Sequence, residues 1–311
     1  MAALTSVRAI ERQRAASRRE LRRFVVGILF VMPWLLGFIF WTAYPILASL
    51  YYSFTAYDVL NPPRFIGWAN YVNLFQHDNL FQTVLGNTIY FVVIGVPAVL
   101  VVSFLLANLL NQEMRFRALF RTAFFVPSIV PAVASAMVWL WMYNPNYGLI
   151  DNMLATFNIP AVPWLSSLGL AKPSLILINV WASGSAILIF LGALQDVPRT
   201  LYDAAVVDGA NRWQRFRNVT VPMSSPAILF VGITSMIGTF QYFTLPWLLT
   251  QGGPDNATNL YAVYLYQNAF QFFKMGYASA MAWVLFVIIV VFTVLIFRTG
   301  GAKVHYAGQA D

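Results

Sequence analysis

The sequence predicts an all-α protein with six membrane-spanning helices. Hydrophobic residues make up 59 % of the 311-residue chain and charged residues only 10 %, against about 25 % charged residues in soluble domains. A soluble fold of this length cannot cover its surface with so few charges. Six stretches of at least 23 residues contain no Asp, Glu, Lys or Arg, and a bilayer core needs about 20 residues of helix. Helix is the required form because lipid cannot satisfy exposed backbone groups.

Trimming the polar ends of these stretches places the six helices. They are expected at residues 24–54, 82–110, 118–143, 173–194, 227–250 and 276–298. The third reaches back to Arg121, whose long side chain can extend to the membrane interface. Kinks are expected because four of the six contain proline beyond their first residue. Periodicity leaves open whether two of these helices are broken or re-entrant.

The placement of Lys and Arg predicts the orientation. Sixteen of the 19 basic residues fall on the side of the two termini, seven of them in the tail at residues 1–23. The other side has only Arg64, Lys172 and Lys274. Since cytoplasmic loops are rich in Lys and Arg, both termini are expected in the cytoplasm. The basic tail lacks interleaved aromatic residues, which favours this topological role over binding of nucleic acid. The remaining divisions are a membrane domain at 24–298 and a tail at 299–311.

Several function classes are excluded by residues that the chain lacks. There is no Cys, and His occurs only at 77 and 305, so thiol catalysis is excluded and no metal site is predicted. No ionisable residue lies at the centre of a span, which argues against a proton or ion relay. The three lysines follow Ala, Phe and Ala, so the Gly-Lys pair of a Walker A motif is absent. The chain is therefore predicted to be no enzyme, and any pumping must be powered by another subunit.

Neutral polar residues stand among aromatic residues in the spans. Hydroxyls, amides and aromatic faces suit an uncharged ligand that carries many hydroxyl groups. The alternative is that these residues close helix–helix contacts, as Ser, Thr and Asn do in bilayers. The polar residues in question are Asn87, Thr88, Ser103, Asn108, Ser128, Ser135, Asn179, Ser183, Ser185, Thr234, Ser235, Thr239, Gln241 and Tyr242.

The connection between the fourth and fifth spans, residues 195–226, is too long for a simple turn. It predicts a short helix at 201–208, a left-handed cap at Gly209 and a second helix at 211–218. The second helix would carry Trp213 and Phe216 on one face. Pro222 and Pro226 are expected to end it before the fifth span. Two short helices with aromatics to bury favour docking of a cytosolic partner; the alternative is an interfacial helix on anionic lipid.

One stretch of this loop resembles a known family. Asp203-Ala204-Ala205-x-x-Asp208-Gly209-Ala210, followed by Phe216 and by Pro222, is similar to the EAA loop of ATP-binding-cassette (ABC) importer permeases. The resemblance implies the type I importer permease fold, in which this loop is a coupling helix that sits in a groove of the ATPase subunit. The chain departs from the family pattern at Asp203, where Glu is usual. The coupling residues implied are Asp203, Ala204, Ala205, Asp208, Gly209, Ala210, Trp213, Phe216 and Pro222.

Flanking motifs resemble the sugar-specific branch of this family, which includes the maltose and glycerol-phosphate systems. They are residues 87–91, 120–127, 144–148, 251–254 and 276–280. By position, Asn179 and Ser235 match in type the sugar-binding residues of the maltose permease, whereas their neighbours differ. The substrate-binding set implied is Asn179, Ser183, Ser235, Thr239, Gln241 and Tyr242.

The resemblance implies a subunit of an ATP-driven importer for a sugar or glycoside in a bacterial-type cytoplasmic membrane. Its expected partners are a second related permease, two cytosolic ATPases that carry ATP and Mg, an extracytoplasmic solute-binding protein and membrane lipid. No cofactor of its own and no nucleic acid are expected. The alternatives are glycerol phosphate or another small solute as cargo, a channel or carrier without ATP coupling, and a structural assembly factor.

Overall fold

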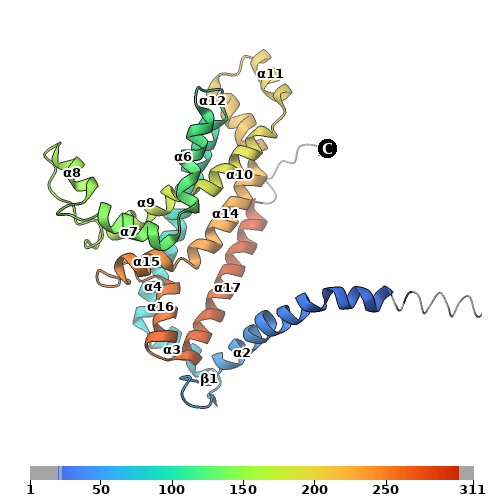
Figure 1. Ribbon diagram of the computed structural model, residues 1–311, viewed down its shortest axis with the longest axis vertical. Coiled ribbons are helices and arrows are strands. Elements are labelled where there is room, and N and C mark those ends of the chain that lie inside the picture. Colours follow the sequence, from blue (N-terminus) through green and yellow to red (C-terminus); the bar gives the residue numbers. More distant parts are fainter. Residues whose placement is uncertain (1–19, 21–22, 301–311) are drawn as a thin grey trace, which may run out of the picture.

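The computed structural model describes residue 20 and residues 23–300, which form an elongated bundle of helices (Figure 1). The described strands are β1 (Thr55–Ala56) and β2 (Arg64–Phe65), which pair antiparallel at one end of the bundle. We call this end, where the last long helix begins, the far end; α11 (Arg199–Val207) and α12 (Arg212–Arg215) lie at the opposite end (Figure 1). The tails predicted at 1–23 and 299–311 lie almost entirely outside the described residues.

Within the described part of the chain, three helices are long and apolar enough to cross a membrane unbroken. They are Arg23–Ser53, Asn79–Asn111 and Met275–Gly300 (α17), and they confirm the first, second and sixth predicted spans. The first contains η1 (Ile39–Ala43) and α2 (Tyr44–Ser53), and the second contains α4 (Asn79–Tyr90), η2 (Phe91–Gly95) and α5 (Val96–Asn111). Pro45 and Pro97 lie in the first turn of an α-helical segment, each after a π-helical turn. The π-helical turn absorbs the missing proline N–H, so the helices continue.

The third and fourth spans are pairs of helices rather than single ones. α6 (Arg117–Ile129) and α7 (Ala132–Met142) meet at 102°, and α9 (Ala171–Trp181) and α10 (Gly184–Gln195) meet at 48°. Pro131 causes the first break, because a residue before proline is held extended and Val130 is extended. The second break, at Ala182 and Ser183, has no proline. Counting each bent pair as one span gives up to six spans, as the sequence predicts.

The fifth span differs from the prediction of one helix over 227–250. α14 (Ser225–Phe240) ends at Phe240, and α15 (Thr244–Thr250) is a separate helix. Pro222 and Pro226 were expected to end the preceding helix before the fifth span; that helix does end there, at Met223, but Pro222 lies within it and Pro226 lies beyond its end. Both lie in the first turn of a helical segment, where proline costs no hydrogen bond. The helix therefore continues from Arg212 to Met223, and the 65° bend comes at Ser224.

Shorter elements complete the two ends of the bundle. The 195–226 loop contains α11 (Arg199–Val207), α12 (Arg212–Arg215), η3 (Phe216–Thr220) and α13 (Val221–Met223). Its first helix confirms the prediction, and its second is longer than predicted. The remaining elements, away from this loop, are α3 (Ala69–Gln76), α8 (Leu149–Ala155), α16 (Tyr261–Tyr266) and η4 (Gln267–Gln271).

Buried apolar side chains form three clusters along the bundle. The cluster nearest the far end joins Phe81, Tyr261 and Met281, which come from α4, α16 and α17. A second cluster lies around Trp139 and Ile178, where α7 and α9 meet α15. The third joins α5 to α10, and side chains of the 195–226 loop pack against it. This last contact connects the loop physically to the spans.

Asp78 holds three segments together at the far end. Its carboxylate caps α4 by accepting from Phe81 N at 2.9 Å, and it also accepts hydrogen bonds from the Tyr264 and Tyr277 hydroxyls. We expect Asp78→Ala to lower the free energy of unfolding by about 2–3 kcal/mol, because the cap and two charge-assisted bonds are lost together. Thermal unfolding in detergent measures this change. Asp58→Ala is the control, since among the described residues that carboxylate bonds the neighbouring Asn61 and joins no distant segment; equal shifts for the two variants would contradict the expectation.

Candidate functional site

A cavity of about 360 Å³ lies between α10 and α14, beside the breaks in the fourth and fifth spans. Seven of its twelve lining residues are polar and none is charged. Its volume falls within the range of small-molecule sites. We call it the substrate cavity. The polar residues that line it are Asn179, Ser183, Ser185, Thr234, Ser235, Thr239 and Tyr242.

Three of these hydroxyls are engaged by the fold itself. Thr234 donates to Phe230 O at 2.9 Å, and Thr239 donates to Ser235 O at 2.8 Å. Ser183 donates to Val180 O at 2.6 Å and accepts from the Ser103 hydroxyl at 2.9 Å. These bonds tie the helix break and the wall of α5 together, so the helix-contact interpretation holds for Ser183. Each oxygen still has acceptor capacity toward the cavity.

The other polar groups of the cavity wall have no partner within the described part of the chain. The side chains of Asn179, Ser185 and Ser235 make no hydrogen bond there, and the buried Tyr242 hydroxyl is unpaired. A buried polar group without a partner costs free energy, about 1–3 kcal/mol. Only the Tyr242 oxygen carries this cost, because Ser185 is exposed and Asn179 and Ser235 are half-buried. The amide and the three hydroxyls are free to bond a ligand that both donates and accepts hydrogen bonds.

Five of the six predicted substrate residues meet in this cavity. Asn179 and Ser183 come from the α9–α10 break, Ser235 and Thr239 from α14, and Tyr242 from the segment after it. Gln241 does not line the cavity, and its side chain is exposed. The structure adds Ser185 and Thr234, which the sequence marked only as polar residues within spans.

The 195–226 loop has a defined backbone geometry. Gly209 is left-handed (φ +75°), as predicted, and Ala210 N donates to Ala205 O at 2.9 Å to close the end of α11. Asn211 and Gln214 then form a reciprocal capping box that begins α12. A hydrogen bond of 3.0 Å between the Tyr202 and Thr220 hydroxyls joins the two helical parts.

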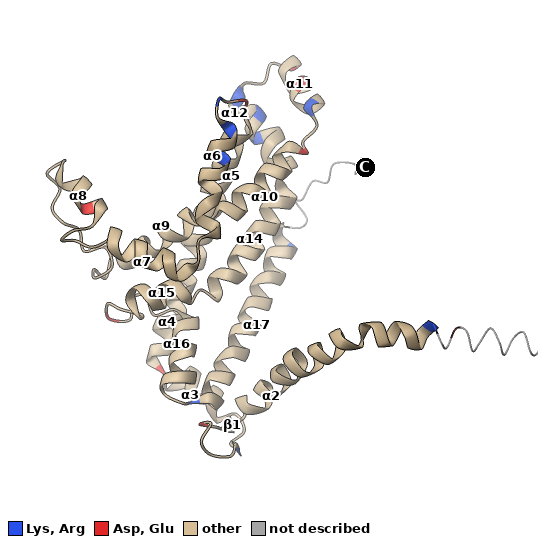
Figure 2. Ribbon diagram, in the orientation of Figure 1, with Lys and Arg blue, Asp and Glu red and all other residues tan. Residues whose placement is uncertain are grey.

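The aromatic pair of this loop connects its surface to the spans. Trp213 stacks on Phe216 with ring centroids 5.5 Å apart, which confirms that they share a face. Phe216 in turn lies 5.9 Å from the Phe104 ring of α5. Trp213 is 67 % exposed and Val207 87 % exposed, so the loop presents apolar surface that the described residues leave uncovered. Lys and Arg gather at this end of the bundle (Figure 2).

The predicted coupling residues divide between surface and interior. Asp203, Ala204, Asp208, Gly209 and Trp213 are exposed, whereas Ala205, Ala210, Phe216 and Pro222 are half-buried. The half-buried set holds the helices in place, and the exposed set forms the surface that a partner would meet. The chain is helical and apolar, its broken spans surround a neutral cavity, and its 195–226 loop extends beyond the spans. These features are typical of a translocation subunit.

Comparison with known proteins identifies the family. Residues 99–299 match the family of binding-protein-dependent transport system inner membrane components. A probable ABC transporter permease protein, YesP of Bacillus subtilis, is 38 % identical over 92 % of this chain and 94 % of its own length. The lactose transport system permease protein LacF of Rhizobium radiobacter is 35 % identical over 90 % of this chain and 96 % of its own. The chain belongs to this family of ABC transporter permeases and is a multi-pass membrane protein. This confirms the family resemblance that the 195–226 loop indicated.

A solved structure confirms the fold. A chain of a bacterial alginate ABC transporter, in complex with an alginate pentasaccharide-bound periplasmic protein, superposes with a TM-score of 0.79 at 21 % identity. The match covers 90 % of this chain and 95 % of that one.

Proposed function

We propose that this chain carries a neutral sugar or glycoside and forms half of the translocation pathway of an ATP-driven importer. The observation that carries this proposal is the substrate cavity, where seven polar side chains meet without a charge. Amides and hydroxyls match the donors and acceptors of a sugar. Relatives named for transport of lactose and, in a probable assignment, of starch degradation products support a carbohydrate as cargo.

The absence of charge on the lining of this cavity bears on whether the cargo is phosphorylated or uncharged. Glycerol phosphate would bring a charged group, and no Lys or Arg lines this cavity in the described part of the chain. An unpaired charge in a low-dielectric site is costly. The wall therefore favours an uncharged ligand over a phosphorylated one.

The path of the chain supports the proposed coupling to ATP hydrolysis. α10 runs from the cavity to Gln195, the 195–226 loop turns, and α14 runs from Ser225 back to the cavity. Two cytosolic ATPases, which would hold ATP and Mg, are proposed to move the exposed face of this loop. Because the loop connects both helices that form the cavity wall, its displacement changes the cavity.

The proposed assembly contains a second related permease and a solute-binding protein on the extracytoplasmic side. The chain would lie in a bacterial-type cytoplasmic membrane with both termini in the cytoplasm, the side of the 195–226 loop. Uptake into proteoliposomes tests this proposal: it should need ATP, the ATPases and the binding protein. The proposal fails if the purified chain concentrates sugar without an ATPase.

Tyr242 offers a clean test of the substrate cavity. Its hydroxyl has no partner in the described structure, so Tyr242→Phe breaks no intramolecular hydrogen bond. We expect the KM for uptake to rise about three- to tenfold, the value of one hydrogen bond, and the unfolding temperature to rise, because the variant removes a buried hydroxyl that has no partner. Uptake assays at graded sugar concentrations measure the KM.

Tyr261→Phe is the matched control. The Tyr261 hydroxyl donates to Met281 O at 2.8 Å, and it does not line the cavity. Its removal should lower the unfolding temperature and leave the KM unchanged. A Tyr242→Phe variant that loses stability but keeps its KM would argue against a ligand contact at this hydroxyl.

A further inference from the structure

The hydroxyl groups of the substrate cavity differ in the direction of their hydrogen bonds. Ser183, Thr234 and Thr239 each donate the hydroxyl hydrogen to a backbone carbonyl, at 2.6, 2.9 and 2.8 Å. A hydroxyl group has one hydrogen and two acceptor lone pairs. While these bonds stand, the three oxygens can only accept a hydrogen bond from a ligand.

Ser183 is held on a second side as well. The Ser103 hydroxyl donates to Ser183 Oγ at 2.9 Å, which occupies one of the two lone pairs. The 2.6 Å from Ser183 Oγ to Val180 O lies at the short end of the range for O–H···O bonds, so the Ser183 hydrogen lies between these two oxygens. One lone pair is left, and Ser183 lines the cavity. Its oxygen therefore offers the ligand a single acceptor position of fixed direction.

Ser103 lies behind the cavity wall. It belongs to α5, which packs along α10, and it is one helical turn from Val99, which lines the cavity. Ser103 itself does not line the cavity, and none of its surface is exposed. Among the described residues, its hydroxyl hydrogen bonds only to Ser183 Oγ. This bond is retained because a buried donor that loses its partner pays the full cost of desolvation.

We propose that Ser103 is a positioning residue for the substrate: it holds Ser183 Oγ as an acceptor, so that the sugar must present a hydroxyl donor at this point of the cavity. This inference rests on the proposed function, since it concerns how the same cavity selects its sugar. Hydrogen bonds in a chain polarise one another, which makes the Ser183 oxygen a stronger acceptor. A ligand atom that only accepts, such as fluorine, would face a lone pair there and be repelled.

The experiment measures uptake by the complete transporter in proteoliposomes. Its probes are the sugar that the transporter takes up with ATP and the monodeoxyfluoro derivatives of that sugar, in which fluorine replaces one hydroxyl group at a time. Fluorine cannot donate a hydrogen bond. For at least one derivative, the unaltered transporter should have a KM about five- to tenfold higher than for the sugar, the value of one hydrogen bond.

Ser103→Ala should weaken this discrimination. Without the Ser103 donor, Ser183 can turn its hydroxyl toward the fluorine, so the ratio of the two KM values should fall about threefold or more. The variant leaves no donor unpaired, and Gly184 still lies against the α6 backbone, so the chain should fold. The binding protein and the ATPases are unchanged, so a change in the ratio belongs to this chain. Ser103→Cys, whose thiol is a weak donor, should give an intermediate ratio.

Tyr71→Phe is the matched control. Ser53 is fully buried, and its hydroxyl donates to Leu50 O at 2.6 Å and accepts from the Tyr71 hydroxyl at 2.8 Å. It is thus held on two sides in the same way as Ser183. Neither Ser53 nor Tyr71 lines the substrate cavity. Removing this donor should therefore leave the KM ratio unchanged.

Three results would overturn the role of Ser103. The first is a KM ratio that Ser103→Ala leaves unchanged, and the second is a KM that rises equally for every probe, as a purely structural defect would cause. The third is an unaltered transporter that takes up the sugar and all its derivatives equally well. The proposed function fails by a different result, which is that the unaltered transporter takes up no sugar with ATP.

Discussion

Gly209→Val is expected to reduce ATP-driven uptake at least tenfold while the chain still assembles in the membrane. Gly209 has φ +75°, a conformation that costs other residues about 1–2 kcal/mol, and more when they are β-branched. The strain would reset the angle between α11 and α12 and so displace the exposed face of the loop. Nothing lies within 4 Å of a Cβ added here, so the effect would come from the backbone and not from a clash. Uptake, ATP hydrolysis and the amount of assembled complex are measured together.

Gly67→Val is the matched control for this loss. Gly67 is also left-handed, with φ +61°, and also has open space around it, but it lies between β2 and α3, outside the 195–226 loop. The same kind of backbone strain there should leave the coupling of ATP hydrolysis to uptake intact. If both variants lose uptake equally, the effect is one of general strain and the coupling role is wrong. If Gly209→Val retains full uptake, a channel or carrier without ATP coupling becomes the better interpretation.

Gly184→Ala is expected to lower the amount of folded protein severalfold and to abolish uptake by what remains. Gly184 begins α10 at the break beside the substrate cavity, and a Cβ there would lie 2.7 Å from Phe124 O and 3.0 Å from Phe125 Cα. The close atoms belong to the backbone of α6 and have no rotamer by which to move away. Overpacking of this kind costs about 1–3 kcal/mol, and here it would separate α6 from α10. Size-exclusion chromatography in detergent and uptake assays measure the two effects.

Gly192→Ala, in the same helix, separates the effect of tight packing from the effect of helix propensity. No atom lies within 4 Å of a Cβ added at Gly192. Alanine is the better helix former by about 1 kcal/mol, so this variant should be at least as stable as the original chain. An unstable Gly192→Ala, or a fully active Gly184→Ala, would show that the α6–α10 contact does not set the geometry of the break.

Much of the architecture follows from composition and spacing. The charge-free stretches place the first, second and sixth spans to within a few residues of the helices Arg23–Ser53, Asn79–Asn111 and α17. Lipid imposes helix on any such stretch, so local sequence suffices there. The loop helices and the left-handed Gly209 were also predictable, because glycine tolerates that conformation and Asn211 begins the next helix.

The breaks in the spans were less predictable. Pro131 ends α6, but the sequence has no such signal at Ala182 and Ser183, where α9 and α10 meet. This break depends on Gly184 lying against the α6 backbone and on Ser183 bonding to Ser103 of α5. Both contacts join segments far apart in the chain. Hydrophobic periodicity reports only which residues are apolar, and not which helix a segment meets.

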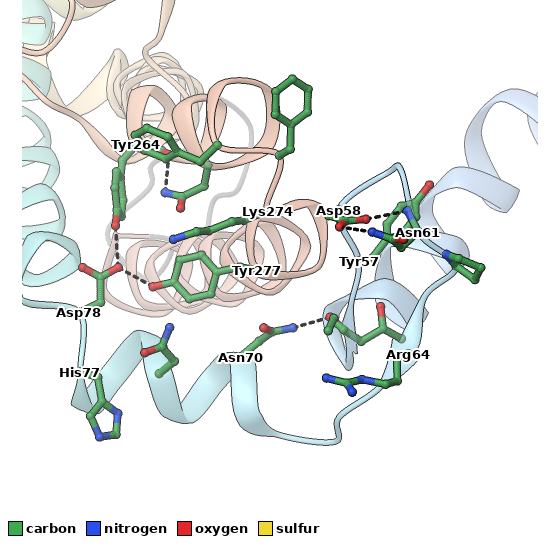
Figure 3. A pocket seen from close by; sticks show the side chains of 17 residues that line it. Tyr57, Asp58, Asn61, Arg64, Asn70, His77, Asp78, Tyr264, Lys274 and Tyr277 are labelled. Atoms are coloured by element: carbon green, nitrogen blue, oxygen red, sulfur yellow. Dashed lines mark hydrogen bonds between the residues drawn. The ribbon is translucent and has the colours of Figure 1, made fainter.

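The sequence by itself determined that this is a helical membrane protein with a neutral polar interior and a loop for a partner, because residue chemistry alone decides which segments lipid accepts. Only the tertiary structure decided which polar residues act together. It brought Asn179 and Ser235 to one cavity and left Gln241 outside. It also joined Asp78 to two tyrosines at the far end (Figure 3). These groupings follow from where broken helices cross and pack, which is a property of three-dimensional contacts and not of local sequence.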